Sequence, residues 1–427
     1  MRVWVVFALL LAACDEPASA RSLDPAVVAA RGDDPAALLA SLRADPGELG
    51  DDEVAFEDAS GHALDVFHRA LRRADAGEGT ARIAMYGGSH TAGDHYTGRI
   101  REVLQARFGD AGHGFVPLVP VVRNHWAWGA VIDEAEGFEV LQVGFKRREV
   151  FRYGLAGAAF QADEPEAFAA VTGDSWGNGR QATRVDLLYD RVPGGGTLEV
   201  WLDGAHVDSL STAADPARNG LRSYEVSDAT HRLEVRAVGD GPVTVFGVVM
   251  ERDVPGVVVH NLGLVGSKAR HQLLWDEDQW AAYLRRLEPD LVVFAYGNNE
   301  TTDTHLTVAD HERDLRAALA RVERAAPDAS CLLLGPTDRP LVGEDGSLEP
   351  RPVVAEITEM QRRVAADLGC AFFDTLAFQG GLGSGATWRS HDPPYLGEDL
   401  QHLTRPGYLR WGEAVVRQLM VGYRPPA

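Results

Sequence analysis

Ser89 stands between a short apolar run and a segment with helical periodicity, in the stretch AMYGGSHTAGD. Residues 82–86 predict a buried strand, Gly87 and Gly88 a sharp turn, and residues 97–108 an amphipathic helix. A serine at such a strand-to-helix elbow is often a nucleophile. An ordinary turn with a serine at the helix start explains the same residues, so this stretch leaves both interpretations open.

A candidate base for this serine lies near the C-terminus, in EDLQHLTRPGY. Asp399 precedes His402 by three residues, so a turn would let the carboxylate bind one ring nitrogen while the other faces a serine. Thr404 and Pro406 are typical of the cap and first turn of a final helix, residues 407–420. A lone histidine is most often structural, but an acid three residues ahead of it favours a catalytic pair.

Two further strand ends could supply hydrogen-bond donors to an oxyanion. The run LVVFAY is followed by GNNET, in which Asn299 could donate its side-chain amide. The run VVVH is followed by NLGLVGS, in which the backbone N–H of Gly266 could approach the same point. Taken alone, the first segment is more often a turn without chemistry, and glycines at strand ends are frequent. Only the combination of the four segments is informative.

In their order along the chain, these four segments resemble the conserved blocks of the SGNH (GDSL-type) hydrolase family. The resemblance implies that Ser89 is the nucleophile, His402 the general base and then acid, and Asp399 the residue that orients His402. It also implies an oxyanion hole built from the N–H groups of Ser89 and Gly266 and the side chain of Asn299.

The resemblance covers residues 81–115 and 256–423. One departure concerns the elbow, because the Gly-Asp-Ser of the family becomes Gly87-Gly88-Ser89 here. That aspartate is not the triad acid, so we expect altered support of the elbow and not loss of chemistry.

Short apolar runs alternate with helical stretches in the parts of the chain that carry these segments. After residues 82–86 come VVVHNL, LVVFAY, CLLLG and AFFD, separated by amphipathic stretches of helix length. Buried strands that alternate with helices predict a parallel sheet with helices on both faces. Five such strands suit an α/β, flavodoxin-like doubly wound domain, whose active site lies at the carboxyl ends of the strands.

Residues 121–252 have a different pattern. TRVDLLYD, GTLEVWLDG, HRLEVRAVG and VTVFGVVM alternate with period two between glycine-rich turns. They predict a carbohydrate-binding-like β-sandwich inserted between the first two strands of the hydrolase domain. The domain would then comprise residues 52–120 and 253–427, and the sandwich should overhang the cleft that contains Ser89.

Aromatic residues in the insert could stack on sugar rings. They are Trp126, Trp128, Trp176 and Trp201. Some of them should simply belong to the core. Trp176 is the first candidate for substrate binding because it lies in the glycine-rich loop TGDSWGNG, where a large ring is less expected in a core.

The N-terminus, MRVWVVFALLLAACDEPASA, reads as an export signal. One arginine precedes an apolar run, residues 3–13, that is too short to span a bilayer. Leu-Ala-Ala-Cys14 resembles the bacterial lipobox, in which cleavage of residues 1–13 leaves a lipidated cysteine. Residues 14–51 would then tether a periplasmic or surface enzyme that touches the membrane only through its lipid. A plain secretory signal, cut near residues 18–20, is the alternative.

Export gives the two remaining cysteines a possible role. Cys331 opens CLLLG and Cys370 opens CAFFD, so both would begin neighbouring strands in an oxidising compartment. A disulfide and two buried thiols are both compatible with this pattern, because bridges between adjacent strands are geometrically demanding.

Composition excludes several function classes. The 427 residues include 63 acidic and 41 basic ones, a net charge of -22, which argues against nucleic acid as a partner. The 14 histidines form no His-Glu-x-x-His or comparable cluster, so we expect no metal. Neither a dinucleotide fingerprint nor a phosphate loop occurs, so we expect no cofactor. We expect a monomer.

Within the SGNH family, the chain looks most like bacterial peptidoglycan O-acetylesterases. The shared features are Gly-x-Asn-Glu, a serine followed by His90, a β-sandwich insert and export. This implies removal of acetyl groups from the 6-hydroxyl of muramyl residues, whereas the site alone indicates only acyl transfer from an ester. A carbohydrate O-acetyltransferase, or a deacetylase of another exported polysaccharide, would share the triad.

A non-enzymatic interpretation is that the chain is an inactive carbohydrate-binding lipoprotein with the same fold. Gly88 would then be a sign of decay at the elbow. Retention of Ser89, Asn299, Asp399 and His402 argues against it, because a decayed site should lose at least one of them.

Overall fold

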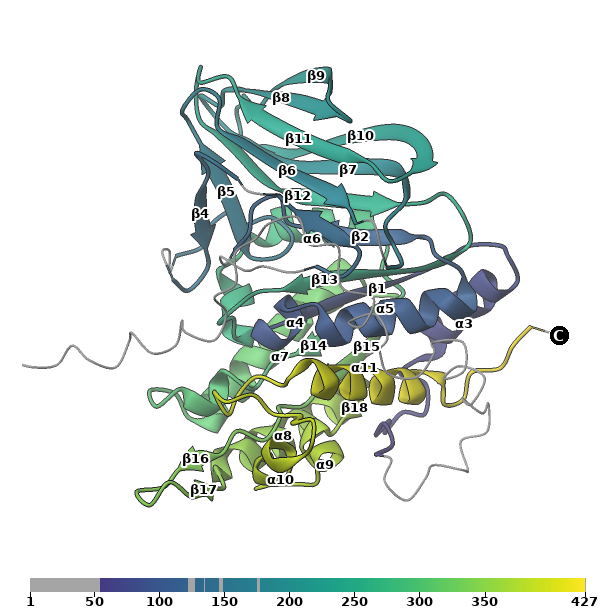
Figure 1. Cartoon of the computed structure of the whole chain (residues 1–427), viewed down its shortest axis with the longest axis vertical. Coiled ribbons are helices and arrows are strands. Elements are labelled where there is room, and N and C mark those ends of the chain that lie inside the picture. Colours follow the sequence, from purple (N-terminus) through teal and green to yellow (C-terminus); the bar gives the residue numbers. More distant parts are fainter. Residues whose placement is uncertain (1–53, 122–126, 134, 146–148, 175–176, 427) are drawn as a thin grey trace, which may run out of the picture.

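A parallel sheet flanked by helices and two antiparallel sheets beyond it organise the chain (Figure 1). The computed structural model describes residues 54–426, apart from 122–126, 134, 146–148 and 175–176. The predictions for the signal, the tether, Cys14, Trp126 and Trp176 lie outside the described residues. Within the described ranges, no helix is both long and apolar enough to span a bilayer.

The parallel sheet has the order β13-β1-β14-β15-β18. All four pairings in it are parallel. Numbered by their order along the chain, the strands follow 2-1-3-4-5, so the prediction of a flavodoxin-like doubly wound sheet is confirmed. The strands are β1 (Thr80–Gly87), β13 (Gly256–Gly263), β14 (Leu291–Ala295), β15 (Ser330–Leu334) and β18 (Ala371–Phe373).

Helices cover both faces of this sheet, and β1 shows why. Successive side chains of a strand point to opposite faces. Ile83 and Met85 belong to the core shared with α3, α5 and α11, whereas Ala84 and Tyr86 belong to the core shared with α6, α7 and α8. The bounds are α3 (Asp65–Asp75), α5 (His95–Phe108), α6 (Glu277–Leu287), α7 (Val308–Ala325), α8 (Pro352–Leu368) and α11 (Arg405–Met420).

Short elements lie at the ends of the strands or in the connections. They are α4 (Ser89–Ala92), α9 (Thr375–Gln379), α10 (Gly385–Ser390), the 3-10 turns η1 (Ala269–Leu274) and η2 (Glu300–Thr302), and the hairpin β16 (Leu341–Val342) and β17 (Leu348–Glu349). One of the amphipathic stretches, HQLLWDEDQWAAYLRRL at residues 271–287, is divided in the structure, because Asp276 caps α6 by accepting a hydrogen bond from the Gln279 N–H.

The insert forms the two antiparallel sheets of the predicted sandwich. One has the order β10-β7-β12-β5-β4, with β2 also paired to β12, and the other β3-β6-β11-β8-β9. β2 lies before residue 121, where the alternating pattern begins in the sequence. The strands are β2 (Gly112–Val116), β3 (Ala130–Ile132), β4 (Glu139–Gln142), β5 (Ala158–Ala162), β6 (Phe168–Gly173), β7 (Ala182–Arg191), β8 (Thr197–Leu202), β9 (Ala205–Ser211), β10 (Arg218–Ala229), β11 (Arg232–Ala237) and β12 (Val243–Glu251).

Helix α6 connects the sandwich to the hydrolase sheet. Its buried side chains share one continuous core with the sandwich strands and with one face of the parallel sheet. The Tyr283 hydroxyl donates to the carbonyl oxygens of Tyr189 and Gly220, at 2.8 and 2.9 Å. The insert is therefore packed against the domain that it interrupts.

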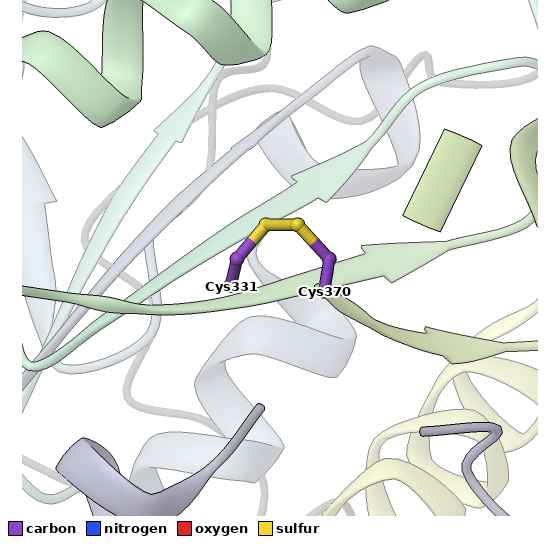
Figure 2. The surroundings of a disulfide bond; sticks show 2 residues. All are labelled: Cys331 and Cys370. Atoms are coloured by element: carbon purple, nitrogen blue, oxygen red, sulfur yellow. A yellow bond between two sulfur atoms is a disulfide. The ribbon is translucent and has the colours of Figure 1, made fainter. Parts of the chain in front are cut away.

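A disulfide joins Cys331 to Cys370 (Figure 2). Both cysteines lie at the amino ends of their strands, opposite the carboxyl ends that lead to Ser89 and Asn299. β15 and β18 pair with Leu332 opposite Ala371, so the two cysteines face each other at neighbouring strand starts. Their Cα atoms are 4.6 Å apart. Of the two states that the sequence left open, the structure contains the bridge.

Candidate active site

The elbow after β1 has no space for side chains at its two glycines. A Cβ on Gly87 would lie 2.0 Å from the Thr91 hydroxyl oxygen. A Cβ on Gly88 would lie 2.8 Å from the Asn299 amide nitrogen. An aspartate at this second position would therefore require the Asn299 side chain to move, whereas the glycine leaves room for the amide where it lies.

Support for the elbow comes instead from Asp94 and Asn261. The Asn261 amide donates to the Thr91 carbonyl oxygen at 2.8 Å and to the Asp94 carboxylate at 2.9 Å. Burial alone would raise the pKa of Asp94, but the Arg101 guanidinium holds that pKa below its ordinary value. The Asp94 carboxylate also accepts a hydrogen bond from the backbone N–H of Trp128 at 2.7 Å. Sequence reasoning did not single out Asp94 or Asn261, although both lie in the quoted segments.

Ser89, His402 and Asp399 form one hydrogen-bonded chain across the carboxyl edge of the sheet. The Ser89 hydroxyl oxygen lies 2.7 Å from His402 Nε2, and His402 Nδ1 lies 2.5 Å from Asp399 Oδ2. The other carboxylate oxygen of Asp399 accepts the backbone N–H of His402 at 2.9 Å. Because a carboxylate can only accept, Nδ1 carries the proton and Nε2 is free to accept from the serine.

Asp399 is held in its ionised form. Partial burial raises its pKa, but the hydrogen bonds from the His402 side chain and backbone outweigh that effect and lower the pKa to about 2. The turn that brings the two residues together has Leu400 at a φ of 55°. It ends where Thr404 caps α11 by accepting the Gly407 N–H. The Asp-x-x-His turn therefore sits directly before the last helix, as the sequence predicts.

His90 packs directly against the histidine of this chain. The rings of His90 and His402 have centroids 5.2 Å apart, and His90 Nδ1 lies 2.9 Å from the Tyr408 hydroxyl oxygen. Burial, with a further contribution from the charge of His402, lowers the pKa of His90 to about 3. A neutral ring therefore lies beside the one that must take up a proton. The sequence placed His90 after the serine but gave it no role.

Gly266 and Asn299 lie on loops that meet at Gly88. The Asn299 amide donates to the carbonyl oxygen of Ser267, the residue after Gly266, at 2.9 Å. The Asn299 amide nitrogen and the Ser267 carbonyl oxygen both lie next to the position that a Cβ on Gly88 would take. Within the described part of the chain, the N–H groups of Ser89 and Gly266 donate to no protein acceptor. These two groups and the second amide hydrogen of Asn299 are thus available to a ligand.

A buried glutamate ties these two loops together. One carboxylate oxygen of Glu300 accepts the N–H of Ala269 at 2.9 Å, and the other accepts the N–H of Gly297 at 3.0 Å. Burial raises the pKa of Glu300. Sequence reasoning noted this glutamate only as part of the Gly-x-Asn-Glu resemblance, and the role as a clamp depends on contacts that no local pattern reveals.

The insert reaches the loop that carries Gly266. The side-chain amide of Gln142, at the end of β4, donates to the Val265 carbonyl oxygen at 2.6 Å. Phe145 lies in the turn after β4, and its side chain is 62% exposed. Its ring lies 2.7 Å from the position that a Cβ on Gly266 would take. An exposed aromatic ring of the insert therefore lies directly on this loop, although sequence reasoning did not single out Phe145.

Two of the predicted aromatic candidates do not lie open at the cleft. Trp128 is wrong as a sugar platform, because it is 1% exposed and packs on Gly98, where a Cβ would lie 2.6 Å from it. Trp201 belongs to β8, which Figure 1 shows in the outer part of the sandwich, well away from α4. The Arg236 guanidinium lies over its ring at 4.8 Å.

Residues 229–410 match the model of the GDSL-like Lipase/Acylhydrolase family. The matched segment contains Gly266, Asn299, Asp399 and His402, whereas Ser89 precedes it. Together with the doubly wound fold, this match defines the class of the protein, a carboxylic ester hydrolase with a GDSL-like domain.

Among solved structures, the chain is similar to a peptidoglycan O-acetylesterase. The two share 23% identity and a TM-score of 0.68, over 84% of this chain and 97% of that chain. This likeness confirms the fold, including the doubly wound α/β domain.

Other solved esterases overlap only in part. An acetyl xylan esterase has 20% identity and a TM-score of 0.28, over 37% of this chain and 78% of its own. A family two carbohydrate esterase from Clostridium thermocellum has 13% identity and a TM-score of 0.26, over 65% and 97%. Overlaps this weak carry no argument about this chain. No curated protein sequence matches it.

Proposed function

We propose that the chain is an exported serine esterase that removes O-acetyl groups from peptidoglycan through an acetyl-enzyme. The observation that carries this proposal is the hydrogen-bonded chain of Ser89, His402 and Asp399. A serine so connected can lose its proton to the imidazole as it attacks an ester, and the carboxylate stabilises the imidazolium that forms.

In the first half of the reaction, the Ser89 hydroxyl oxygen attacks the acetyl carbonyl carbon while His402 Nε2 takes the serine proton. The negative charge that develops on the carbonyl oxygen is met by the N–H groups of Ser89 and Gly266 and by the Asn299 amide. His402 then gives the proton to the departing sugar oxygen, and the acetyl group remains on Ser89.

In the second half, water attacks the acetyl-enzyme and His402 again accepts and returns the proton. Acetate leaves and the free Ser89 hydroxyl is restored. The neutral state of His90 supports this cycle, because a second cation beside His402 would oppose the formation of an imidazolium.

Three observations support peptidoglycan as the substrate: one from the fold, one from the N-terminal sequence and one from the insert. The fold is similar to that of a peptidoglycan O-acetylesterase. The N-terminal sequence has the pattern of an exported bacterial lipoprotein, which would deliver the enzyme to the cell wall. The insert borders the Gly266 loop with an exposed aromatic ring, which suits a polymeric glycan better than a small ester.

The test is an assay of purified protein on p-nitrophenyl acetate and on O-acetylated peptidoglycan. We expect activity on both. Ser89→Ala and His402→Ala should each lower turnover by roughly a thousandfold or more, while Asp399→Ala retains more activity, because the acid mainly orients and stabilises the imidazole.

Each other outcome has a defined meaning. Near-normal turnover by the Ser89→Ala variant would contradict a mechanism in which Ser89 is the nucleophile. Activity on p-nitrophenyl acetate without release of acetate from peptidoglycan would contradict peptidoglycan as the substrate. Activity on neither would favour a binding protein, and transfer of acetyl to an added sugar in place of water would favour a transferase.

A further inference from the structure

Two arginines stand at the carboxyl edge of the sheet without a carboxylate partner. Arg339 follows β15, and Arg351 directly precedes α8. Both side chains are half-buried. Within the described residues, neither guanidinium forms an ion pair within 4.0 Å, in a protein with 63 acidic and 41 basic residues. For comparison, Arg362 on α8 binds the carboxylates of Glu57, Glu359 and Asp374.

Arg339 lies next to the proposed catalytic residues. Its guanidinium is 3.4 Å from the carbonyl oxygen of Asn298, the residue before the proposed oxyanion donor Asn299. Its charge acts on the other side of the site as well, because it contributes to the lowered pKa of His90 and is attracted by Asp399. The Arg339 guanidinium therefore contacts the loop before Asn299 and is close enough to the Asp-x-x-His turn for its charge to act there.

Arg351 is held beside Arg339 in spite of its like charge. Arg351 Nε donates to the Arg339 carbonyl oxygen at 3.0 Å. Burial, and then the charge of Arg351, lower the pKa of Arg339. Two cations kept together in a half-buried place repel each other, and an anion bound between them would relieve this cost.

Two carboxylates of the surrounding loops already bind other groups. Asp399 binds His402. Asp338 is buried and accepts the Gly385 N–H at 2.7 Å. Because no described carboxylate lies within 4.0 Å of either guanidinium, the two arginines remain available to an anion from a ligand.

We infer that Arg339 and Arg351 bind a carboxylate of the acetylated glycan, so that the enzyme selects acidic acetyl sugars over neutral ones. This inference rests on the proposed function and names the chemistry of its substrate. Guanidinium groups suit carboxylates because their paired N–H donors match the two oxygens. In a muramyl glycan, the carboxylate could belong to the lactyl ether of the acetylated sugar itself or to a stem peptide.

The experiment compares substrates that differ only in this charge. 6-O-Acetyl-N-acetylmuramic acid carries the free lactyl carboxylate, and its lactyl methyl ester does not. We expect kcat/KM of the wild-type enzyme to be at least about tenfold higher for the acid. Arg339→Gln and Arg351→Gln should bring that ratio close to one, and Arg339→Lys should restore part of it because it keeps the charge.

The ratio between the two substrates is the readout because a substitution that merely disturbs the Asn298 loop lowers both rates together. The matched control is Arg363→Gln on α8, whose guanidinium pairs with Glu312 on an exposed face. The control should keep the wild-type ratio. A wild-type ratio that survives both Arg339→Gln and Arg351→Gln would overturn the inference.

A second pair of substrates locates the carboxylate. If the wild-type enzyme does not distinguish the acid from its ester, O-acetylated glycan with and without stem peptides is compared next. A preference for the stem-bearing glycan that both glutamine variants lose assigns the arginines to a peptide carboxylate. No arginine-dependent preference in either pair overturns carboxylate recognition. Failure of the proposed function is seen separately, as a wild-type enzyme that hydrolyses p-nitrophenyl acetate but none of the muramyl substrates.

Discussion

At the scale of single residues, Gly88 lies between the proposed nucleophile, Ser89, and the proposed oxyanion donor, Asn299. The missing side chain leaves the space that the Asn299 amide occupies, 2.8 Å from where a Cβ would lie. The amide is then free to serve as a donor next to Ser89. One small residue therefore fixes the relative position of two groups that come from different strands.

Substituting Gly88 by alanine should lower kcat with little change in KM. The new methyl group would push away the Asn299 amide, which acts mainly in the transition state. We expect a loss of at least about tenfold, and about a hundredfold for Asn299→Ala. In the double variant the losses should not multiply, because both substitutions remove the same donor.

The control for this pair is Gly93→Ala, at the other end of α4. A Cβ there meets its nearest neighbours at 3.5 Å, an ordinary contact distance. Steady-state kinetics of the four variants measure whether the losses in kcat from Gly88→Ala and Asn299→Ala are independent. Losses that multiply in full in the double variant would mean that Gly88 and Asn299 act separately.

The sequence could predict which residues meet in the site better than what holds them there. The order of the serine, glycine, asparagine and Asp-x-x-His segments identified five positions, and in the structure Ser89, His402 and Asp399 are hydrogen-bonded. Asp94 and Glu300 could not be assigned their roles, because a buried carboxylate that accepts backbone N–H groups from distant loops has no local signature.

At the scale of elements, the turn after β4 is what brings the insert to the site. Gln142 ties this turn to the Gly266 loop, and Phe145 lies over the glycine. The sequence indicated that the insert would reach the cleft, because an insertion after the first strand emerges near the carboxyl edge. It could not indicate which loop would do so, since that depends on how the two sandwich sheets pack on α6.

Removing the Phe145 ring should affect polymer and small substrate unequally. For Phe145→Ala we expect the ratio of activity on O-acetylated peptidoglycan to that on p-nitrophenyl acetate to fall about three- to tenfold, the effect of losing one aromatic stacking contact. The small substrate, p-nitrophenyl acetate, carries no glycan that could stack on the ring.

The melting temperature separates this effect from damage to the fold. Phe145 is 62% exposed, so its removal should shift the melting temperature by little. Val207→Ala, which trims a 44% exposed side chain on β9, is the control and should leave the ratio unchanged. An unchanged ratio in Phe145→Ala would mean that the ring does not contact the glycan.

At the scale of the whole molecule, we predict that the N-terminus decides where the enzyme acts. Cys14→Ser should release the protein from the membrane fraction into a soluble exported fraction, because a lipidated cysteine is the proposed anchor. Fractionation followed by immunodetection measures this. Equal membrane association of the two forms would contradict the lipoprotein prediction and leave a plain secretory signal, or another contact with the envelope, as its replacement.

The path of the chain through the parallel sheet has a consequence for the order of folding. β1 lies between β13 and β14, and both of these partners follow the whole insert along the chain. As the polypeptide is delivered from its N-terminus, β1 and the Ser89 elbow must wait unpaired until residues beyond 256 arrive. The sandwich strands are contiguous in the sequence, so they can pair before the parallel sheet can, although their core is completed only when α6 packs on it. The parallel sheet is therefore the last part of the chain that can close, and a chain that ends before β13 lacks the strand that pairs with β1 from Thr80 to Gly87, just before the Ser89 elbow.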